Sequence, residues 1–172
     1  MTEPVLMNDQ EIRDSISNMA YSIVRKSPDL SHTFLIGIKT RGVYVAGRLS
    51  DKIKEISGVR LKVGELDTRP FRDDIDYEGG NESVMPFNVD GADIIIVDDV
   101  LYTGRTMRAA MDAIIEYGRP SSIKISVLID RGHREYPISA DFVGRMIPTS
   151  SRETVRMKLR EIDGGRDRVI VI

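Results

Sequence analysis

The chain contains no cysteine and no tryptophan, and its two histidines are His32 and His133. The lack of cysteine excludes disulfide bonds, thiolate metal sites and cysteine nucleophiles, and two histidines are too few for a multi-histidine metal centre. No apolar run approaches the roughly 18 residues that a membrane-spanning helix needs, and the first residues carry acids where a secretory signal would be basic and then apolar. We therefore expect a soluble, cytoplasmic protein that does not bind membranes.

Neither sign of charge dominates the chain, because 25 Lys plus Arg stand against 27 Asp plus Glu, for a formal net charge of -2 at pH 7. This balance excludes a generally basic nucleic-acid-binding surface but leaves room for local basic patches. A length of 172 residues with 41% hydrophobic residues suffices for one domain with a sizeable core and is too short for two large ones. We predict a single domain over residues 1–172.

Hydrophobic periodicity predicts that strands and helices alternate along the chain. Apolar runs predict strands at 34–38, 61–66, 94–97 and 123–129, and helical spacing predicts helices at 12–24, 45–56 and 107–115. A capping box at Asn8 and Glu11 precedes the first helix. The β-branched residues at 94–97 are typical of a central parallel strand that is covered on both faces and that ends at the acids following it. The fold class predicted is α/β, a mostly parallel, doubly wound sheet with ligands beyond the carboxyl ends of its strands.

Two regions outside this regular pattern have distinct characters. The segment 67–88 is polar, with two adjacent glycines and two prolines, and it buries too little apolar area to order strongly. We interpret it as a mobile loop that closes over a site as a lid, carrying Arg69 and Arg72, the alternative being an inert surface excursion. Residues from about 130 to 172 read as short strands and turns and predict a small C-terminal hood.

The residues after the 94–97 run combine features of a sugar site and of a phosphate site. Adjacent carboxylates, Asp98 and Asp99, are reasonable if they face the hydroxyls of a sugar diol or a metal-bound ligand. The segment 103–106 leads into a helix, where free N–H groups and the positive end of the helix dipole attract an anion. Together they indicate a phosphorylated pentose site, although each could also be an exposed strand end and an ordinary capped turn.

Residues 94–106 resemble the phosphoribosyl diphosphate (PRPP) fingerprint of type I phosphoribosyltransferases. Further similarity narrows the resemblance to the bifunctional uracil phosphoribosyltransferases that also regulate pyrimidine operons; it lies at 35–44, 64–67, 72–74, 130–135, 140–144 and 147–150. The resemblance spans nearly the whole chain. It implies the type I phosphoribosyltransferase fold, a homodimer or larger homo-oligomer, and Mg²⁺-dependent synthesis of UMP and pyrophosphate from uracil and PRPP.

The resemblance also implies a role for each matching residue of the PRPP site. Asp98 and Asp99 would be the catalytic pair that holds the ribose hydroxyls, and Thr40 and Arg41 would bind pyrophosphate in a loop whose family counterpart often has a non-proline cis peptide. The 5′-phosphate would be bound by Thr103, Gly104, Arg105 and Thr106. Mg²⁺ would be held mainly by pyrophosphate and ribose oxygens. From the residues alone, 39–42 could equally be a plain strand-to-helix turn.

For the base, the resemblance implies that Arg131 and the backbone around Ile147 hold uracil. Taken by itself, Arg131 could equally form an ion pair with Asp130 or Glu135. The remaining alternatives for the activity are a purine phosphoribosyltransferase and a nucleotide-sensing RNA-binding regulator with negligible catalysis.

A second activity implied by the resemblance is the binding of pyrimidine-operon leader mRNA in response to the uridine nucleotides UMP and UTP. His133, Arg134 and Arg145 match part of the basic pattern that this binding uses, although His133 and Arg134 could also be a solvated charge run. The chain departs from the pattern at three positions where phosphate donors are expected, namely Asn18, Tyr21 and Ser139.

Overall fold

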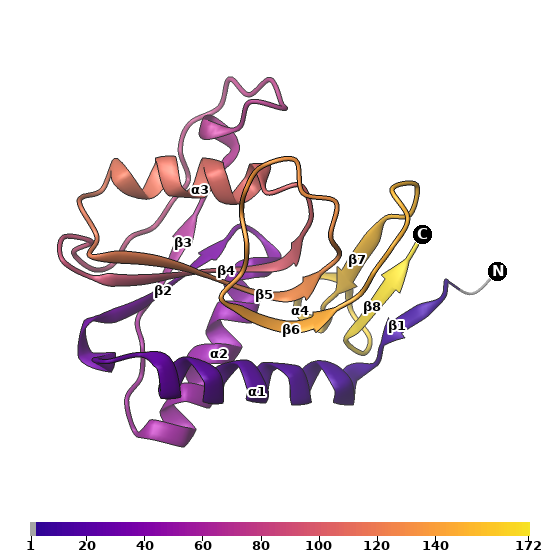
Figure 1. Ribbon diagram of the computed structural model, residues 1–172, viewed down its shortest axis with the longest axis horizontal. Helices are drawn as coiled ribbons and strands as arrows, with labels where there is room; N and C mark the ends of the chain where they lie inside the picture. Colours follow the sequence, from indigo (N-terminus) through magenta and orange to yellow (C-terminus); the bar gives the residue numbers. More distant parts are fainter. Residues whose placement is uncertain (1–2) are drawn as a thin grey trace.

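Residues 3–172, which the computed structural model describes, form a five-stranded parallel sheet and a three-stranded antiparallel sheet (Figure 1). The strand order is β3-β2-β4-β5-β6 in the larger sheet and β1-β8-β7 in the smaller one. The strands are β1 Val5–Met7, β2 Thr33–Ile38, β3 Val63–Leu66, β4 Asp93–Leu101, β5 Ser122–Asp130, β6 Phe142–Met146, β7 Val155–Lys158 and β8 Arg168–Val171. The predicted α/β fold with a mostly parallel sheet is confirmed.

Helices cover both faces of the parallel sheet, as a doubly wound fold requires (Figure 1). The helices are α1 Asp9–Lys26, α2 Arg41–Ser57, α3 Arg105–Ile115 and the short α4 Arg160–Asp163, with 3₁₀ turns η1 Leu30–His32 and η2 Arg69–Phe71. The expected capping box starts α1, because Asn8 and Glu11 each accept a hydrogen bond from the other's backbone N–H. Among residues 3–172, no helix has the length and apolarity to span a membrane.

Strand β4 is the centre of the core, and its consecutive β-branched residues alternate between the two faces. Ile95 and Val97 pack in the cluster formed with α1 and α2, whereas Ile94 and Ile96 pack in the cluster formed with α3. The cluster under α1 and α2 also takes in Met157 of the smaller sheet. The two sheets therefore share one hydrophobic core.

One expectation about the strands was wrong, and one strand was not predicted. The strand predicted at 94–97 does not end at the paired acids. β4 continues to Leu101 because β5 remains paired beside it, with Leu101 opposite Asp130. Asp98 and Asp99 thus lie inside the strand. The strand β1, which precedes α1, was not predicted from the sequence; it pairs with β8 in the smaller sheet.

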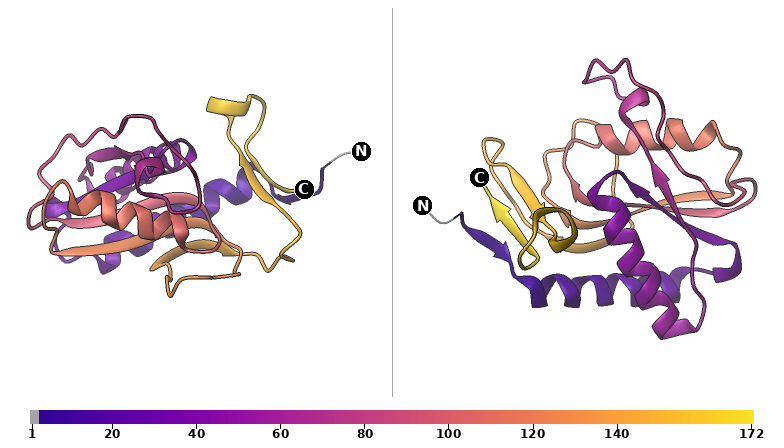
Figure 2. Two further views of the ribbon diagram at one scale, coloured as in Figure 1. Left: turned by 90° about the horizontal axis from the view of Figure 1, so that it is seen from above. Right: turned by 180° about the vertical axis from the view of Figure 1, so that it is seen from behind.

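The C-terminal region divides between the two sheets. β6 pairs in parallel with β5 and completes the larger sheet, so part of the region predicted as a hood belongs to the main layer. β7 and β8 form the antiparallel hairpin of the smaller sheet, with α4 in its connection. Figure 2 shows this sheet to one side of the larger one. It approaches the start of α2, where Arg41 Nε donates to the carbonyl of Met157 at 2.8 Å.

Candidate active site

Two cavities lie side by side at the carboxyl ends of the central strands. One of about 290 Å³ is lined by residues 102–107 and Glu135, together with β4 residues and two residues of the 67–88 loop. The other, of about 480 Å³, is lined by residues 38–41 and by Asp99, with further residues of the 67–88 loop. Arg72, Asp98 and Thr106 line both cavities. The two cavities therefore form one cleft, and Arg72 lies where they meet.

Sheet register explains why these loops meet. β2 and β4 run in parallel with Gly37 opposite Val97, so the residues that follow β2 lie beside the paired acids. The expected cis peptide bond is present between Lys39 and Thr40. Gly42, the second residue of α2, lies against β4, where a Cβ atom would lie 2.5 Å from the carbonyl oxygen of Val97. The close approach of α2 to β4 at this point requires glycine.

The two acids differ in their surroundings. Asp98 is only 8% exposed and accepts a hydrogen bond from the Asp99 backbone N–H at 2.9 Å, while Asp99 accepts one from the Val100 N–H at 2.8 Å. Burial, followed by the neighbouring Asp99 charge, raises the pKa of Asp98 well above its ordinary value, and the charge of Arg72 opposes this only in part. A buried carboxylate in this condition gains from hydroxyl donors, such as those of a sugar diol.

This burial has a measurable consequence for stability. Where folding raises the pKa of a carboxyl group, the folded protein becomes less stable as the pH rises from the pKa of the unfolded state, 3.8, through that of the folded state. Asp98→Asn cannot ionise and retains the acceptor oxygen, so we expect it to unfold at higher urea concentration than the wild type near pH 8, with the difference vanishing near about pH 4. A variant that is less stable at pH 8, or a difference independent of pH, would contradict the buried charge.

The phosphate-binding segment predicted at 103–106 is the turn that begins α3. Gly104 has a φ of 91°, in the left-handed region that favours glycine, and Thr103 Oγ1 accepts a hydrogen bond from the Arg105 backbone N–H at 3.2 Å. The first N–H groups of α3 therefore adjoin the smaller cavity. Thr106 Oγ1 accepts a hydrogen bond from Arg72 Nη1 at 2.8 Å.

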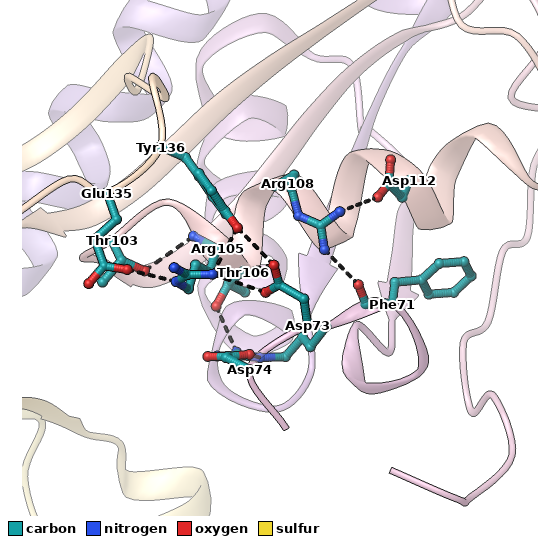
Figure 3. Close-up of polar contacts among 11 residues, drawn as sticks. Phe71, Asp73, Asp74, Thr103, Arg105, Thr106, Arg108, Asp112, Glu135 and Tyr136 are labelled. Carbon is teal, nitrogen blue, oxygen red and sulfur yellow. Dashed lines mark hydrogen bonds and ion pairs between the residues drawn. The ribbon is translucent and has the colours of Figure 1, made fainter. Parts of the chain in front are cut away.

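Arg105 and Arg72 both line the smaller cavity, and acids hold the guanidinium group of each. The Arg105 guanidinium is engaged by two acids, donating from Nε to Glu135 at 2.7 Å and from Nη1 to Asp73 at 3.2 Å (Figure 3). Arg72, interpreted as a lid residue, reaches Thr106 of the 103–106 turn and is held by both oxygens of Asp74 at 2.8 and 2.6 Å. The acids that hold these two arginines are Asp73, Asp74 and Glu135. None of them was predicted from the sequence as a partner of Arg72 or Arg105.

The other predicted lid and pyrophosphate residues have partners of their own. Arg69 pairs with both oxygens of Asp67 and with Glu82, so it ties together the two ends of the 67–88 loop. Thr40 and Arg41 line the larger cavity, but the Arg41 guanidinium is also anchored outside it, on Asp163 at 3.1 Å.

The predicted base-binding residues are parts of a buried framework. Arg131 is 5% exposed and donates to Thr149 Oγ1 and to the carbonyls of Ser150 and Glu153, at 3.0, 3.0 and 2.7 Å. Its guanidinium lies over the ring of Tyr102, 4.0 Å from the ring centre. The Ile147 N–H donates to the backbone of β5 at 2.9 Å, which leaves its carbonyl for a ligand.

The alternative that Arg131 pairs with a neighbouring acid is wrong. Asp130 pairs instead with Arg134 at 2.6 Å, and Glu135 pairs with Arg105. Arg134 also donates to the carbonyls of Tyr102 and Ile138, so it is a brace within the fold rather than part of a solvated charge run.

The three residues predicted to bind RNA lie in different surroundings. His133 is exposed, and its Nε2 contacts the carbonyl of Thr149. Arg134 is engaged in the brace described above, and Arg145 on β6 lies 3.3 Å from Glu11 at the start of α1. Whether these residues contact RNA stays a prediction.

Comparison with known proteins shows what the chain resembles. Residues 6–161 match the sequence profile of the phosphoribosyl transferase domain. The chain is 45% identical over 172 residues to a protein of Streptococcus equi subsp. zooepidemicus named "Bifunctional protein PyrR", covering 100% of this chain and 98% of that protein. It is 46% identical over 167 residues to a Streptococcus pyogenes protein of the same name, covering 97% of this chain and 95% of that one.

Solved structures with the same fold have more distant sequences. A hypoxanthine-guanine phosphoribosyltransferase of Bacillus anthracis superposes with a TM-score of 0.76 at 18% identity, covering 100% of this chain and 98% of the other. A hypoxanthine phosphoribosyltransferase of Trypanosoma cruzi gives 0.74 at 19% identity, covering 99% and 96%. At such identities the likeness concerns the fold alone.

Proposed function

The chain belongs to the phosphoribosyltransferase family, in its PyrR group, and on that premise we propose that it joins uracil to the ribose of PRPP, forming UMP and pyrophosphate. The observation that carries this proposal is one cleft that combines the buried acid pair of β4, the first turn of α3 and the loop at 39–41. These three groups are the kinds that would bind a diol, a 5′-phosphate and a pyrophosphate on one ribose.

Displacement of pyrophosphate from the anomeric carbon leaves positive charge on the ribose ring. Asp98 and Asp99 accept hydrogen bonds from the ribose hydroxyls and favour that charge through their carboxylates. The first N–H groups of α3, with the Thr103 and Thr106 hydroxyls, bind the 5′-phosphate. Thr40 and the neighbouring backbone bind pyrophosphate in the larger cavity. No side chain of the chain needs to act as a nucleophile, because the uracil nitrogen bonds directly to the anomeric carbon. The bond from that carbon to pyrophosphate breaks, and the proton of the attacking nitrogen is released to solvent.

Mg²⁺ fits the oxygen-rich larger cavity, where Asp98, Asp99 and Thr40 are grouped. Within residues 3–172, no cluster of three or more His, Cys, Asp or Glu side chains forms a ready metal site. We propose that the ion is held mainly by PRPP and pyrophosphate oxygens, with the acid pair nearby, as this hard cation commonly is. Bound there, it would neutralise the charge of the leaving group.

We also propose that the chain binds pyrimidine-operon leader mRNA in response to UMP or UTP. The support is its likeness to relatives that are named bifunctional. His133 is exposed and could contact phosphate, whereas the pairing of Arg145 with Glu11 would have to be exchanged.

One pair of assays tests these proposals. With PRPP and Mg²⁺, we expect uracil to trigger pyrophosphate release, whereas hypoxanthine, guanine and adenine should not. Release with a purine but not with uracil would make the chain a purine phosphoribosyltransferase. Negligible release with every base, together with leader RNA binding that UMP strengthens in a gel shift, would make it a regulator without significant catalysis.

A further inference from the structure

Tyr136 connects the 67–88 loop to the phosphate-binding turn. Its hydroxyl donates to Asp73 Oδ2 at 2.7 Å and accepts from Arg105 Nη1 at 2.8 Å (Figure 3). Arg105 Nη1 also contacts Asp73, and the Arg105 guanidinium lies 4.6 Å from the centre of the Tyr136 ring. Tyr136, Asp73 and Arg105 therefore close a triangle of contacts, which we call the latch. The hydrogen bond from Tyr136 lowers the pKa of Asp73, so the acid stays charged in the latch.

One end of the latch is fixed to the site by backbone contacts. The N–H groups of Glu135 and Tyr136 donate to the carbonyl of Thr103 at 2.9 and 3.1 Å. Ile138 packs against Gly104, where an added Cβ would lie 3.1 Å from the Ile138 side chain. The segment that carries Tyr136 is thus bound to the turn that begins α3.

The other end of the latch adjoins Arg72, whose side chain lies in the cleft. Asp73 lies between Arg72 and Asp74 in the chain, and Asp74 holds the Arg72 guanidinium at 2.8 and 2.6 Å. Arg72 reaches Thr106 Oγ1 at 2.8 Å and lines both cavities. Because these residues are consecutive, the position at which Asp73 is held sets the position from which Arg72 extends.

We propose that Tyr136 is a positioning residue that holds the 67–88 loop through Asp73, so that Arg72 presents its charge to PRPP at the junction of the two cavities. This inference rests on the proposed function, since it assigns PRPP as the ligand that meets Arg72. Arg72 is the arginine at this junction, because it lines both cavities whereas Arg105 lines only the smaller one.

Limited proteolysis tests the latch without any need for turnover. Trypsin can cut after Arg72, whereas the bond after Arg69 is protected by Pro70. We expect Tyr136→Phe, which keeps the ring but removes the hydroxyl, to raise the rate of cleavage after Arg72 about threefold to tenfold, as the loss of a partly exposed hydrogen bond to a charged group would. The matched control is Tyr117→Phe, at an exposed tyrosine just after α3, and it should be cut at the wild-type rate.

Kinetics test the positioning role. We expect Tyr136→Phe to raise KM for PRPP about threefold to tenfold while kcat stays within about twofold, because the reacting atoms keep their contacts. Asp73→Asn should reproduce this split, and the double variant should be no worse than the more affected single one. A loss confined to kcat, or an unchanged KM, would overturn the positioning role.

The two assays separate this inference from the proposed function. The absence of any uracil-dependent product would mean that the proposed reaction fails. The positioning role would still stand if PRPP with Mg²⁺ slows cleavage after Arg72 less in Tyr136→Phe than in the wild type. If Tyr136→Phe is cleaved at the wild-type rate, the latch does not hold the loop, and the inference fails whatever the activity.

Discussion

Asp98→Asn and Asp99→Asn are each expected to lower kcat for UMP formation by about a hundredfold or more, the range seen when one preorganised electrostatic group is removed from a site. Each substitution keeps the shape and the acceptor oxygen of the side chain but removes the negative charge that favours a cation-like ribose. Both residues border the larger cavity, and Asp98 is buried beside it. The measurement is steady-state pyrophosphate release at saturating PRPP, uracil and Mg²⁺.

The matched control for the acid pair is Asp51→Asn. Asp51 is an exposed carboxylate of α2 that pairs with Arg60 at 2.6 Å, and its removal should leave kcat unchanged because exposed ion pairs contribute little. The stability measurements on Asp98→Asn provide a second check, since we expect that variant to be folded, and more stable than the wild type at neutral pH, while it is nearly inactive. Wild-type kcat in both acid variants would remove their catalytic assignment.

Gly42→Ala is expected to reduce kcat/KM for PRPP by about a hundredfold, because a displacement of about 1 Å in a positioned site can cost that much. The new methyl group would lie 2.5 Å from the Val97 carbonyl oxygen and 3.2 Å from the Cα atom of Asp98. Since both contacts are with backbone, the start of α2 must move away from β4 and carry the 39–41 loop with it. The free energy of unfolding should also fall by about 1–3 kcal/mol from overpacking, as measured by urea denaturation.

Gly47→Ala provides the control within the same helix. A Cβ atom at Gly47 meets nothing within 4 Å, and alanine in a helix interior is more favourable than glycine by about 0.5–1 kcal/mol. This variant should therefore keep full activity and be as stable as the wild type or more so. Equal activity of the two alanine variants would show that the close approach at Gly42 does not position the site.

The order of strands and helices and the place of the acid pair could be predicted because both depend on local patterns. Apolar runs and helical spacing mark β2, β4 and α3, and a parallel sheet brings their carboxyl ends together. The strand β1 could not be predicted in this way, since its three residues are defined by pairing with β8, where Val5 lies opposite Ile170. A short strand whose partner lies far away in the chain has too few residues to show a hydrophobic pattern that would predict it.

The partners of the arginines were equally hidden from sequence reasoning. Arg105 lies within the 103–106 turn, and nothing near it in the chain shows that Glu135 and Asp73 would occupy its guanidinium. The choice depends on how residues some thirty positions away on either side fold back over α3. The contact of Arg72 with Thr106 likewise depends on how distant parts of the chain fold together, and the sequence does not show it.

Because the two sheets share a hydrophobic core, the smaller sheet is an integral part of the domain. Val155, Met157 and Val169 of β7 and β8 are buried in the same cluster as Leu35 and Ile95 of the parallel sheet. A common core of this kind favours loss of order in a single cooperative transition rather than in two independent ones. Damage to the hairpin would therefore also destabilise the strands that carry the cleft.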